Sequence, residues 1–212
     1  ETCLVQEFQN LSNGAHDALA KALRQAKRRV ALWTALCDLS GIWSLEQVTH
    51  CLTEFADLSV SLALKDALTV QLARTKLPVP TAVSDPDQLG MFVLAMGKMG
   101  AHELNYSSDI DLICLFDESQ FDPEDFFQAR SAFIAAIKKM TAVLSDLTAE
   151  GYVFRTDLRL RPNPSVTPVC MGVEAAERYY ESLGRTWERA AFIKARGAAG
   201  DAKVGTKFLE NL

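Results

Sequence analysis

The sequence lacks the features that mark membrane-spanning, secreted and nucleic-acid-coating proteins. No run approaches the about 18 consecutive apolar residues of a membrane span, and no basic segment followed by an apolar one marks a secretory signal. The 22 Lys and Arg are outnumbered by 27 Asp and Glu, which leaves a formal charge of -5. That balance argues against a surface that binds nucleic acid by neutralising phosphates. We therefore predict a cytoplasmic protein that binds neither nucleic acid nor a membrane.

Cysteine and histidine are too few and too scattered for a disulfide framework or a zinc site. The chain has only three histidines and five cysteines, with no Cys-x-x-Cys pair. We expect the cysteines to be reduced thiols. His102 is interpreted as a residue on a helix surface, because zinc ligation would need other nitrogen or sulfur ligands nearby. The cysteines are Cys3, Cys37, Cys51, Cys114 and Cys170.

The 212 residues are 49% hydrophobic and 23% charged, which is ordinary for a globular protein with a sizeable core. Because the chain begins at Glu1 rather than Met, we expect it to be a piece of a longer polypeptide. Its patterns divide it into three parts. These are a leading helical segment (1–88), a catalytic core (89–172) and the start of a C-terminal helical region (173–212).

The leading segment has the apolar periodicity of helices. Apolar residues recur at steps of three and four over 12–74, with an interruption at Ser40-Gly41. Ser44 and Gln47 form a plausible capping box for a second helix after that break. The basic run 24–29 is predicted to lie on a solvated helix face. Prolines within 75–89 end the helical segment.

The rest of the chain predicts an α+β fold in which short strands alternate with helices. Two apolar runs suit buried strands, and a third segment alternates between apolar and polar residues. The predicted strands are 91–96, 110–116 and 152–160. The predicted helices are one that starts at Asp122-Pro123 and is ended by Gly151, and two closing helices over 173–183 and 186–199.

The most informative motif is an Asp-x-Asp pair, Asp109 and Asp111. In a strand both carboxylates emerge on one face, and two adjacent anions are unfavourable unless a cation or a proton intervenes. Mg²⁺ prefers such oxygen ligands. Asp157 completes the set if its strand lies alongside, and three carboxylates can hold two metal ions roughly 3.5 to 4 Å apart. The motif is no EF-hand, because Cys114 stands where that loop needs glycine.

Groups suited to phosphate surround this motif in the sequence. Gly97 and Gly100 precede it, so backbone amides can approach a phosphate closely, although the P-loop pattern is absent. Arg155, Arg159 and Arg161 share the alternating face of Asp157, and arginine binds phosphate oxygens bidentately. Two blander interpretations stay open. Asp-x-Asp can be a solvated strand end or a cap, and the arginines can pair with the aspartates as a structural salt-bridge network.

The motif resembles that of a known superfamily. Gly97, Asp109-Ile110-Asp111 and the later Asp157 are similar to the signature of the nucleotidyltransferases related to DNA polymerase β. A more specific resemblance, to bacterial glutamine synthetase adenylyltransferase/adenylyl-removing enzymes, rests on longer motifs. These are Gly97-Lys98-Met99-Gly100 with ELNYSSDIDLI (103–113), FRTDLRLRP (154–162), Tyr179-Tyr180-Glu181, and GRTWER (184–189) followed by Lys194-Ala195-Arg196.

The resemblance implies a polymerase β-like mixed sheet and one of two similar catalytic modules. The residues of 103–111, 187–189 and 194–196 resemble those of the N-terminal, adenylyl-removing module more than those of the other module. That implies a Mg²⁺-dependent phosphorolysis, in which inorganic phosphate attacks adenylyl-tyrosine of glutamine synthetase and releases ADP. The implied partners are glutamine synthetase, ADP or ATP, inorganic phosphate and the PII signalling protein as a regulator of nitrogen assimilation.

The resemblance also implies roles for individual residues. Asp109, Asp111 and Asp157 would be catalytic metal ligands. Lys98, Arg159 and Arg161 would bind phosphate oxygens beside Gly97, and Ser108 would donate a hydrogen bond to one of them. Arg189, Lys194 and Arg196 would form a second basic wall, or only a charged surface.

Two other functions remain open on the sequence. One is the reverse transfer, adenylylation of glutamine synthetase from ATP by the same fold. The other is a non-catalytic nucleotide- or partner-binding module whose carboxylates and arginines pair with one another.

Overall fold

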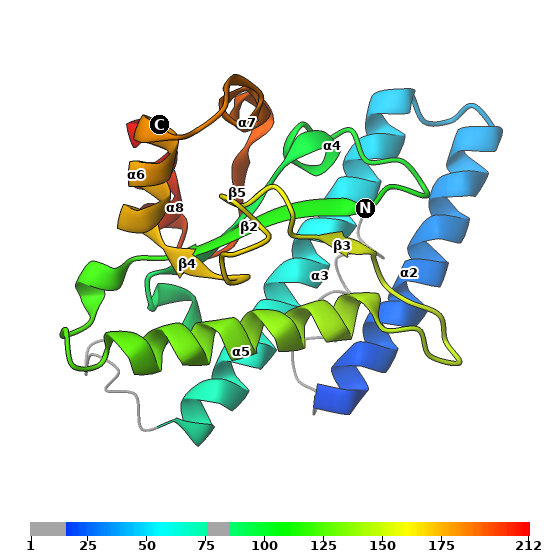
Figure 1. Ribbon diagram of the computed structural model, residues 1–212. Coiled ribbons are helices and arrows are strands. Elements are labelled where there is room, and N and C mark those ends of the chain that lie inside the picture. Colours follow the sequence, from blue (N-terminus) through cyan, green and yellow to red (C-terminus); the bar gives the residue numbers. More distant parts are fainter. Residues whose placement is uncertain (1–15, 76–84) are drawn as a thin grey trace.

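The computed structural model describes residues 16–75 and 85–212, which form an α+β fold with a mixed sheet (Figure 1). Cys3 and the prolines Pro78 and Pro80 lie outside the described residues. Among the described helices, none combines the length and the apolar character needed to cross a membrane. The four described cysteines, Cys37, Cys51, Cys114 and Cys170, are free thiols.

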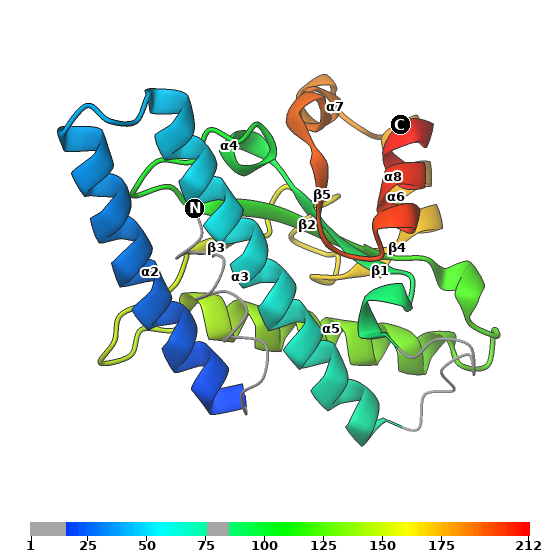
Figure 2. The same ribbon diagram turned by 180° about the vertical axis from the view of Figure 1, so that it is seen from behind.

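Two long helices, α2 (His16–Leu39) and α3 (Leu45–Arg74), lie side by side (Figure 2). The predicted break between them is confirmed. So is the capping box, because the Ser44 hydroxyl accepts from the Gln47 amide and the Gln47 side chain accepts from the Ser44 amide. One apolar stripe of each helix is buried against the other, and α3 also packs against the sheet.

The five-stranded sheet of the described residues has the order β3-β2-β1-β5, and β4 also pairs with β2. β1 (Met91–Ala95) lies antiparallel to both β2 (Ile110–Phe116) and β5 (Arg196–Gly200). The other edge of β2 is shared by two short parallel strands. These are β3 (Thr156–Asp157) at the beginning of β2 and β4 (Met171–Gly172) at its end.

Both faces of the sheet are covered, which explains why β1 and β2 are largely continuous apolar runs. Met91, Val93 and Ala95 of β1 face the core formed with α2, α3 and α5. Phe92 and Leu94 face the opposite core, formed with α6 and α8 (Figures 1 and 2). The remaining helices are α4 (Gly97–Gly100), α5 (Phe126–Ser145), α6 (Val173–Ser182), α7 (Thr186–Ala191) and α8 (Ala202–Asn211), with 3-10 turns η1 (Pro86–Gln88), η2 (Glu118–Gln120) and η3 (Phe192–Lys194).

Two predicted elements are shorter than expected, for one shared reason. α5 spans only Phe126–Ser145, and the predicted strand 152–160 is paired only at Thr156–Asp157. The amides of Val153 and Phe154 both donate to the Leu144 carbonyl, at 2.8 and 3.0 Å. Residues 153 and 154 therefore pack against the end of α5 instead of pairing with β2, and the Val153 side chain is buried.

The prediction of a single closing helix over 186–199 is wrong. The chain there forms α7, then η3, and then β5 at the edge of the sheet. After Arg196, β5 consists of Gly and Ala, which have low strand propensity, so its sequence gives no strand signal. Its close pairing with β1 needs small residues, since a Cβ on Gly200 would lie 2.2 Å from the Met91 carbonyl oxygen.

The basic run of α2 is only in part the solvated face that we predicted, because Arg28 and Arg29 are exposed but Arg24 is buried. Arg24 is only 2% exposed and donates to three carbonyls, those of Ala20, Asp146 and Gly151, at 2.6 to 2.8 Å. The Lys27 ammonium donates to the Val153 carbonyl. The run therefore ties α2 to the loop that follows α5, because a buried carbonyl needs a donor.

Arg24→Met is expected to lower the free energy of unfolding by about 3 kcal/mol, because it leaves carbonyls without a donor in a buried site. Arg28→Met is the matched control, since Arg28 forms an ion pair with Glu150 at the surface, where such a pair contributes about 1 kcal/mol or less. Urea denaturation measures both. Equal losses in the two variants would contradict the role given to Arg24.

Candidate active site

The three predicted aspartates lie at one end of the sheet. Asp111 of β2 and Asp157 of β3 are register partners in a parallel pair, so their side chains leave neighbouring strands on the same side. Asp109 precedes β2 directly, and the amide of the next residue, Ile110, donates to the Arg155 carbonyl at 2.9 Å. The carboxylates of Asp109, Asp111 and Asp157 are thus brought together by β2 and β3.

Asp111 is a half-buried carboxylate whose surroundings oppose its charge. Burial raises its pKa, and the neighbouring charges of Asp157 and Asp109 raise it further. Ile110 and Leu112, on either side of it in β2, are fully buried on the opposite face and hold the strand in place. The site therefore holds one half-buried carboxylate between two others, an arrangement that favours a bound cation.

Gly97 occupies the space beside this carboxylate. It begins α4 at the end of β1, where the Met96 amide donates to the Asp111 carbonyl at 2.9 Å. Its φ is +54°, and a Cβ built there would lie 3.0 Å from Asp111 Oδ2. Glycine at this position keeps open the space next to the carboxylate, which any other residue would fill.

Arginines partner the two outer carboxylates. Arg155 forms an ion pair with Asp109, and its Nη2 donates to the Ser107 carbonyl at 3.0 Å. Arg159 donates to Asp157 from its backbone amide at 2.8 Å and from Nη2 at 2.5 Å. The Arg159 hydrogen bonds lower the pKa of Asp157. The pairing of arginines with aspartates, which the sequence left open, is therefore present at Asp109 and Asp157.

The donor set fits a magnesium ion in its chemistry. Carboxylate oxygens are the ligands that Mg²⁺ prefers, and burial, together with the neighbouring Asp157 and Asp109 charges, raises the pKa of Asp111. As the side chains stand, no three His, Cys, Asp or Glu side chains in 16–75 and 85–212 surround a common point. Asp109 and Asp157 are each paired with an arginine instead.

The predicted phosphate-binding residues are placed differently from one another. Lys98 is exposed on α4, next to Gly97. The Ser108 hydroxyl donates to Asn105 Oδ1 at 2.8 Å and so stabilises the loop before Asp109. Arg161 donates to the carbonyls of its own loop, including those of Leu158 at 2.7 Å and Pro164 at 2.8 Å. Arg161 therefore orders the loop after β3.

The residues of the predicted second basic wall are distributed over the scaffold. Arg189 Nη2 donates to the Tyr180 carbonyl at 2.5 Å and ties α7 to α6. Lys194 forms an ion pair with Glu103 at 2.7 Å. Arg196 pairs with Asp57 of α3 at 2.8 Å. Each of these cations is engaged by a different part of the molecule.

The sequence did not point to Asp57. Burial raises the pKa of Asp57, and the hydrogen bond from Arg196 only partly offsets this rise. The available signal was an acidic residue in an otherwise apolar stretch of α3. His102 was predicted on a helix surface, yet it lies in the turn after α4 with a positive φ of 59°. Its ring lies 5.4 Å from that of His50, and burial lowers its pKa.

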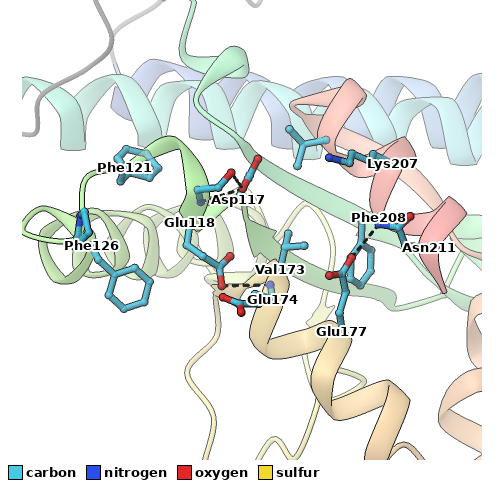
Figure 3. Close-up of a pocket in the computed structure, with 13 residues that line it drawn as sticks. Asp117, Glu118, Phe121, Phe126, Val173, Glu174, Glu177, Lys207, Phe208 and Asn211 are labelled. Atoms are coloured by element: carbon cyan, nitrogen blue, oxygen red, sulfur yellow. Dashed lines mark hydrogen bonds between the residues drawn. The ribbon is translucent and has the colours of Figure 1, made fainter.

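A pocket of about 700 Å³ lies beyond the other end of β2, away from the aspartates (Figure 3). Aromatic and aliphatic side chains of α5, α6, α8 and the segment between η2 and α5 form much of its wall. Its acidic residues have structural partners. Asp117 accepts from the Ser119 amide, Glu118 from the Glu174 amide, Glu174 pairs with Arg178, and Glu177 accepts from Asn211. Of these contacts, the one from Glu118 joins η2 to α6 and the one from Glu177 joins α6 to α8.

The mixed sheet covered by helices, with an Asp-x-Asp pair at the beginning of a central strand and a third aspartate beside it, is nucleotidyltransferase-like. A family model described as Glutamate-ammonia ligase adenylyltransferase matches residues 2–211. The chain belongs to this family.

Curated relatives agree with the family. The chain is 49% identical over 193 residues to a protein of Bradyrhizobium sp. (strain BTAi1), covering 91% of this chain and 20% of that protein. It is 42% identical over 217 residues to one of Agrobacterium fabrum, covering 100% of this chain and 22% of the relative. Both are named bifunctional glutamine synthetase adenylyltransferase/adenylyl-removing enzyme. The chain thus spans about a fifth of the length of these relatives.

Proposed function

We propose that this chain carries the adenylyl-removing activity of its family and acts on adenylylated glutamine synthetase. Inorganic phosphate attacks the adenylyl phosphorus, the bond from phosphorus to the tyrosine oxygen breaks, and ADP and tyrosine are released. The phenolate takes a proton from solvent. The relatives' names supply the substrate and both directions of transfer. The resemblance of 103–111, of 187–189 and of 194–196 to the N-terminal module supports removal over attachment.

One observation carries the proposal of catalysis. The half-buried Asp111 carboxylate lies between Asp109 and Asp157, and burial together with these two neighbouring charges raises its pKa. Such a cluster costs stability unless a cation joins it. We propose that the three carboxylates hold Mg²⁺, which supplies positive charge for the phosphoryl oxygens.

The residues of the chain then have separate tasks. Gly97 leaves room for an adenylyl oxygen beside Asp111, because no side chain fills that space. Lys98 is exposed next to it and binds a phosphate oxygen. The Arg159 side chain is 82% exposed, so it can turn from Asp157 to a phosphate. Because inorganic phosphate is already an anion, the attack needs little help from a general base.

The direct test uses adenylylated glutamine synthetase, inorganic phosphate and Mg²⁺. We expect the chain to release ADP, and Asp109→Asn to reduce the rate by at least about 10³-fold, because a lost carboxylate leaves developing charge without compensation. Asp117→Asn at the far end of β2 is the matched control and keeps the activity. ADP is measured with a coupled assay.

Two outcomes would select the other functions. Transfer of label from α-labelled ATP to glutamine synthetase, independent of phosphate, would favour attachment of AMP. A calorimetric titration that finds no binding of Mg²⁺ or ADP would favour a non-catalytic module. In such a module the Arg155–Asp109 and Arg159–Asp157 ion pairs are purely structural, and no metal or phosphate replaces them.

A further inference from the structure

Arg196 joins three elements that are far apart in the sequence. It begins β5, and its Nη2 lies 2.8 Å from Asp57 Oδ2 of α3 and donates to the Met99 carbonyl of α4 at 3.0 Å. The side chains of Arg196 and Asp57 are only 24% and 23% exposed. Because a half-buried ion pair of this kind adds little net stability, its position is better explained by the geometry that it imposes.

Further contacts hold the same short segment. A Cβ on Gly100 would lie 1.9 Å from the Lys194 carbonyl oxygen, so α4 packs directly against the backbone of η3. Lys194 also pairs with Glu103 at 2.7 Å. On the other side, the Leu104 amide donates to Thr53 Oγ1 of α3 at 3.4 Å. The turn from Gly97 to Leu104 is therefore clamped between α3 and the chain that enters β5.

This segment includes the glycine beside the candidate catalytic carboxylate. α4 has four residues, and Gly97 at its start lies against Asp111. A helical turn this short has few hydrogen bonds of its own, so its placement depends on tertiary contacts. A shift of α4 would move Gly97 and Lys98 relative to the aspartates.

We propose that Arg196 and Asp57 are a positioning pair that sets α4 against the Asp109–Asp111 strand, and that Arg196 does not contact the substrate. This inference rests on the proposed function for its effect on catalysis, but its structural part does not. The orientation of the guanidinium supports it. Arg196 Nη2 is directed at Asp57 and Met99, and Nε is buried, so the group faces the scaffold.

Hydrogen exchange in the 212-residue chain tests the structural part. The reporters are the amides of Gly100, Ala101 and Glu103, which donate within the turn at 2.8 to 3.2 Å. Arg196→Met and Asp57→Leu are each expected to speed exchange in 97–104 by about ten-fold, because the clamp is lost. The double variant is expected to match Arg196→Met, since that change already removes both the Asp57 ion pair and the Met99 hydrogen bond. Lys65→Met is the control, because it removes an exposed ion pair from the same helix.

Kinetics with adenylylated glutamine synthetase test the catalytic part. Arg196→Met is expected to lower kcat by about 100-fold, as for other misplacements of a catalytic group, while the KM for phosphate stays within about three-fold. Arg196→Lys keeps a charge and an Asp57 partner, and we expect it to recover part of both the exchange protection and kcat. Because it is the milder change, it also serves if Arg196→Met does not fold.

The outcomes separate this inference from the proposed function. Unchanged exchange in 97–104, with a weaker affinity for phosphate in Arg196→Met but not in Asp57→Leu, would overturn it by making Arg196 a substrate contact. Additive losses in the double variant would overturn the pairing. An inactive wild-type chain with faster exchange in both variants would contradict the proposed function and support the positioning role.

Discussion

Asp111→Asn is expected to abolish ADP release and, at the same time, to stabilise the metal-free chain at neutral pH. The loss of activity, by at least about 10³-fold, follows from removing the central carboxylate of the proposed metal site. The gain in stability follows from removing a charge that burial and the neighbouring Asp157 and Asp109 carboxylates make unfavourable. Thermal unfolding measures the gain, and the coupled ADP assay measures the loss.

The pH dependence of the unfolding free energy provides a second test of this stability gain. The pKa of Asp111 is raised in the folded chain, so its ionisation costs stability. Below the unfolded pKa the group is protonated in both states and the variant has no advantage. As the pH rises through the folded pKa, the advantage of Asp111→Asn grows and then levels off. An advantage that shrinks toward neutral pH would contradict this account.

Added Mg²⁺ is expected to raise the Tm of the wild-type chain but not that of Asp111→Asn. If the three carboxylates bind Mg²⁺, the ion raises the Tm of the wild-type chain, because a ligand of the folded state stabilises it by mass action. We expect that rise to be absent in Asp111→Asn and retained in the control Asp117→Asn, whose carboxylate caps η2. A Tm rise of equal size in Asp111→Asn would place the ion elsewhere.

Gly100→Ala is expected to have the largest effect on stability, a loss of about 3 kcal/mol or more, because overpacking against backbone cannot be relieved by a change of rotamer. The added Cβ would lie 1.9 Å from the Lys194 carbonyl oxygen and 2.7 Å from the Ala95 carbonyl oxygen. Either α4 or the chain entering β5 must move. Urea denaturation gives the free energy of unfolding.

Gly197→Ala in β5 is the matched control for this substitution. A Cβ there meets nothing within 4 Å, and its φ is not in the left-handed region. We expect its stability to change by less than about 0.5 kcal/mol. A Gly100→Ala variant as stable as Gly197→Ala would show that α4 is not packed closely against η3.

The sequence predicted the elements whose signals are local. The apolar runs became β1 and β2, the Ser44–Gln47 capping box begins α3, and Val173 begins α6. These features depend on residues close to one another in the chain, and periodicity and capping report on such neighbours. The roles proposed for the site residues stay predictions that the experiments above test.

The partners of the long cations could not be predicted in the same way. Arg24 reaches the loop after α5, and Arg196 reaches α3, across 122 to 139 residues of chain. The sequence alone does not distinguish a basic residue that faces solvent from one that binds a phosphate or a buried carbonyl. Only packing selects among these, because long side chains take the partner that the fold brings within reach.

By itself the sequence determined the order of the main elements, the family and the spacing that sets Asp109 and Asp111 on one side of a strand. The tertiary structure decided that Asp157 pairs beside Asp111 and that β5 completes the sheet. It also decided which scaffold groups Arg189, Lys194 and Arg196 contact. The physical reason is that alternation and helical periodicity are properties of a few neighbouring residues. Strand pairing and ion pairing, by contrast, depend on which distant segments the closed core brings together.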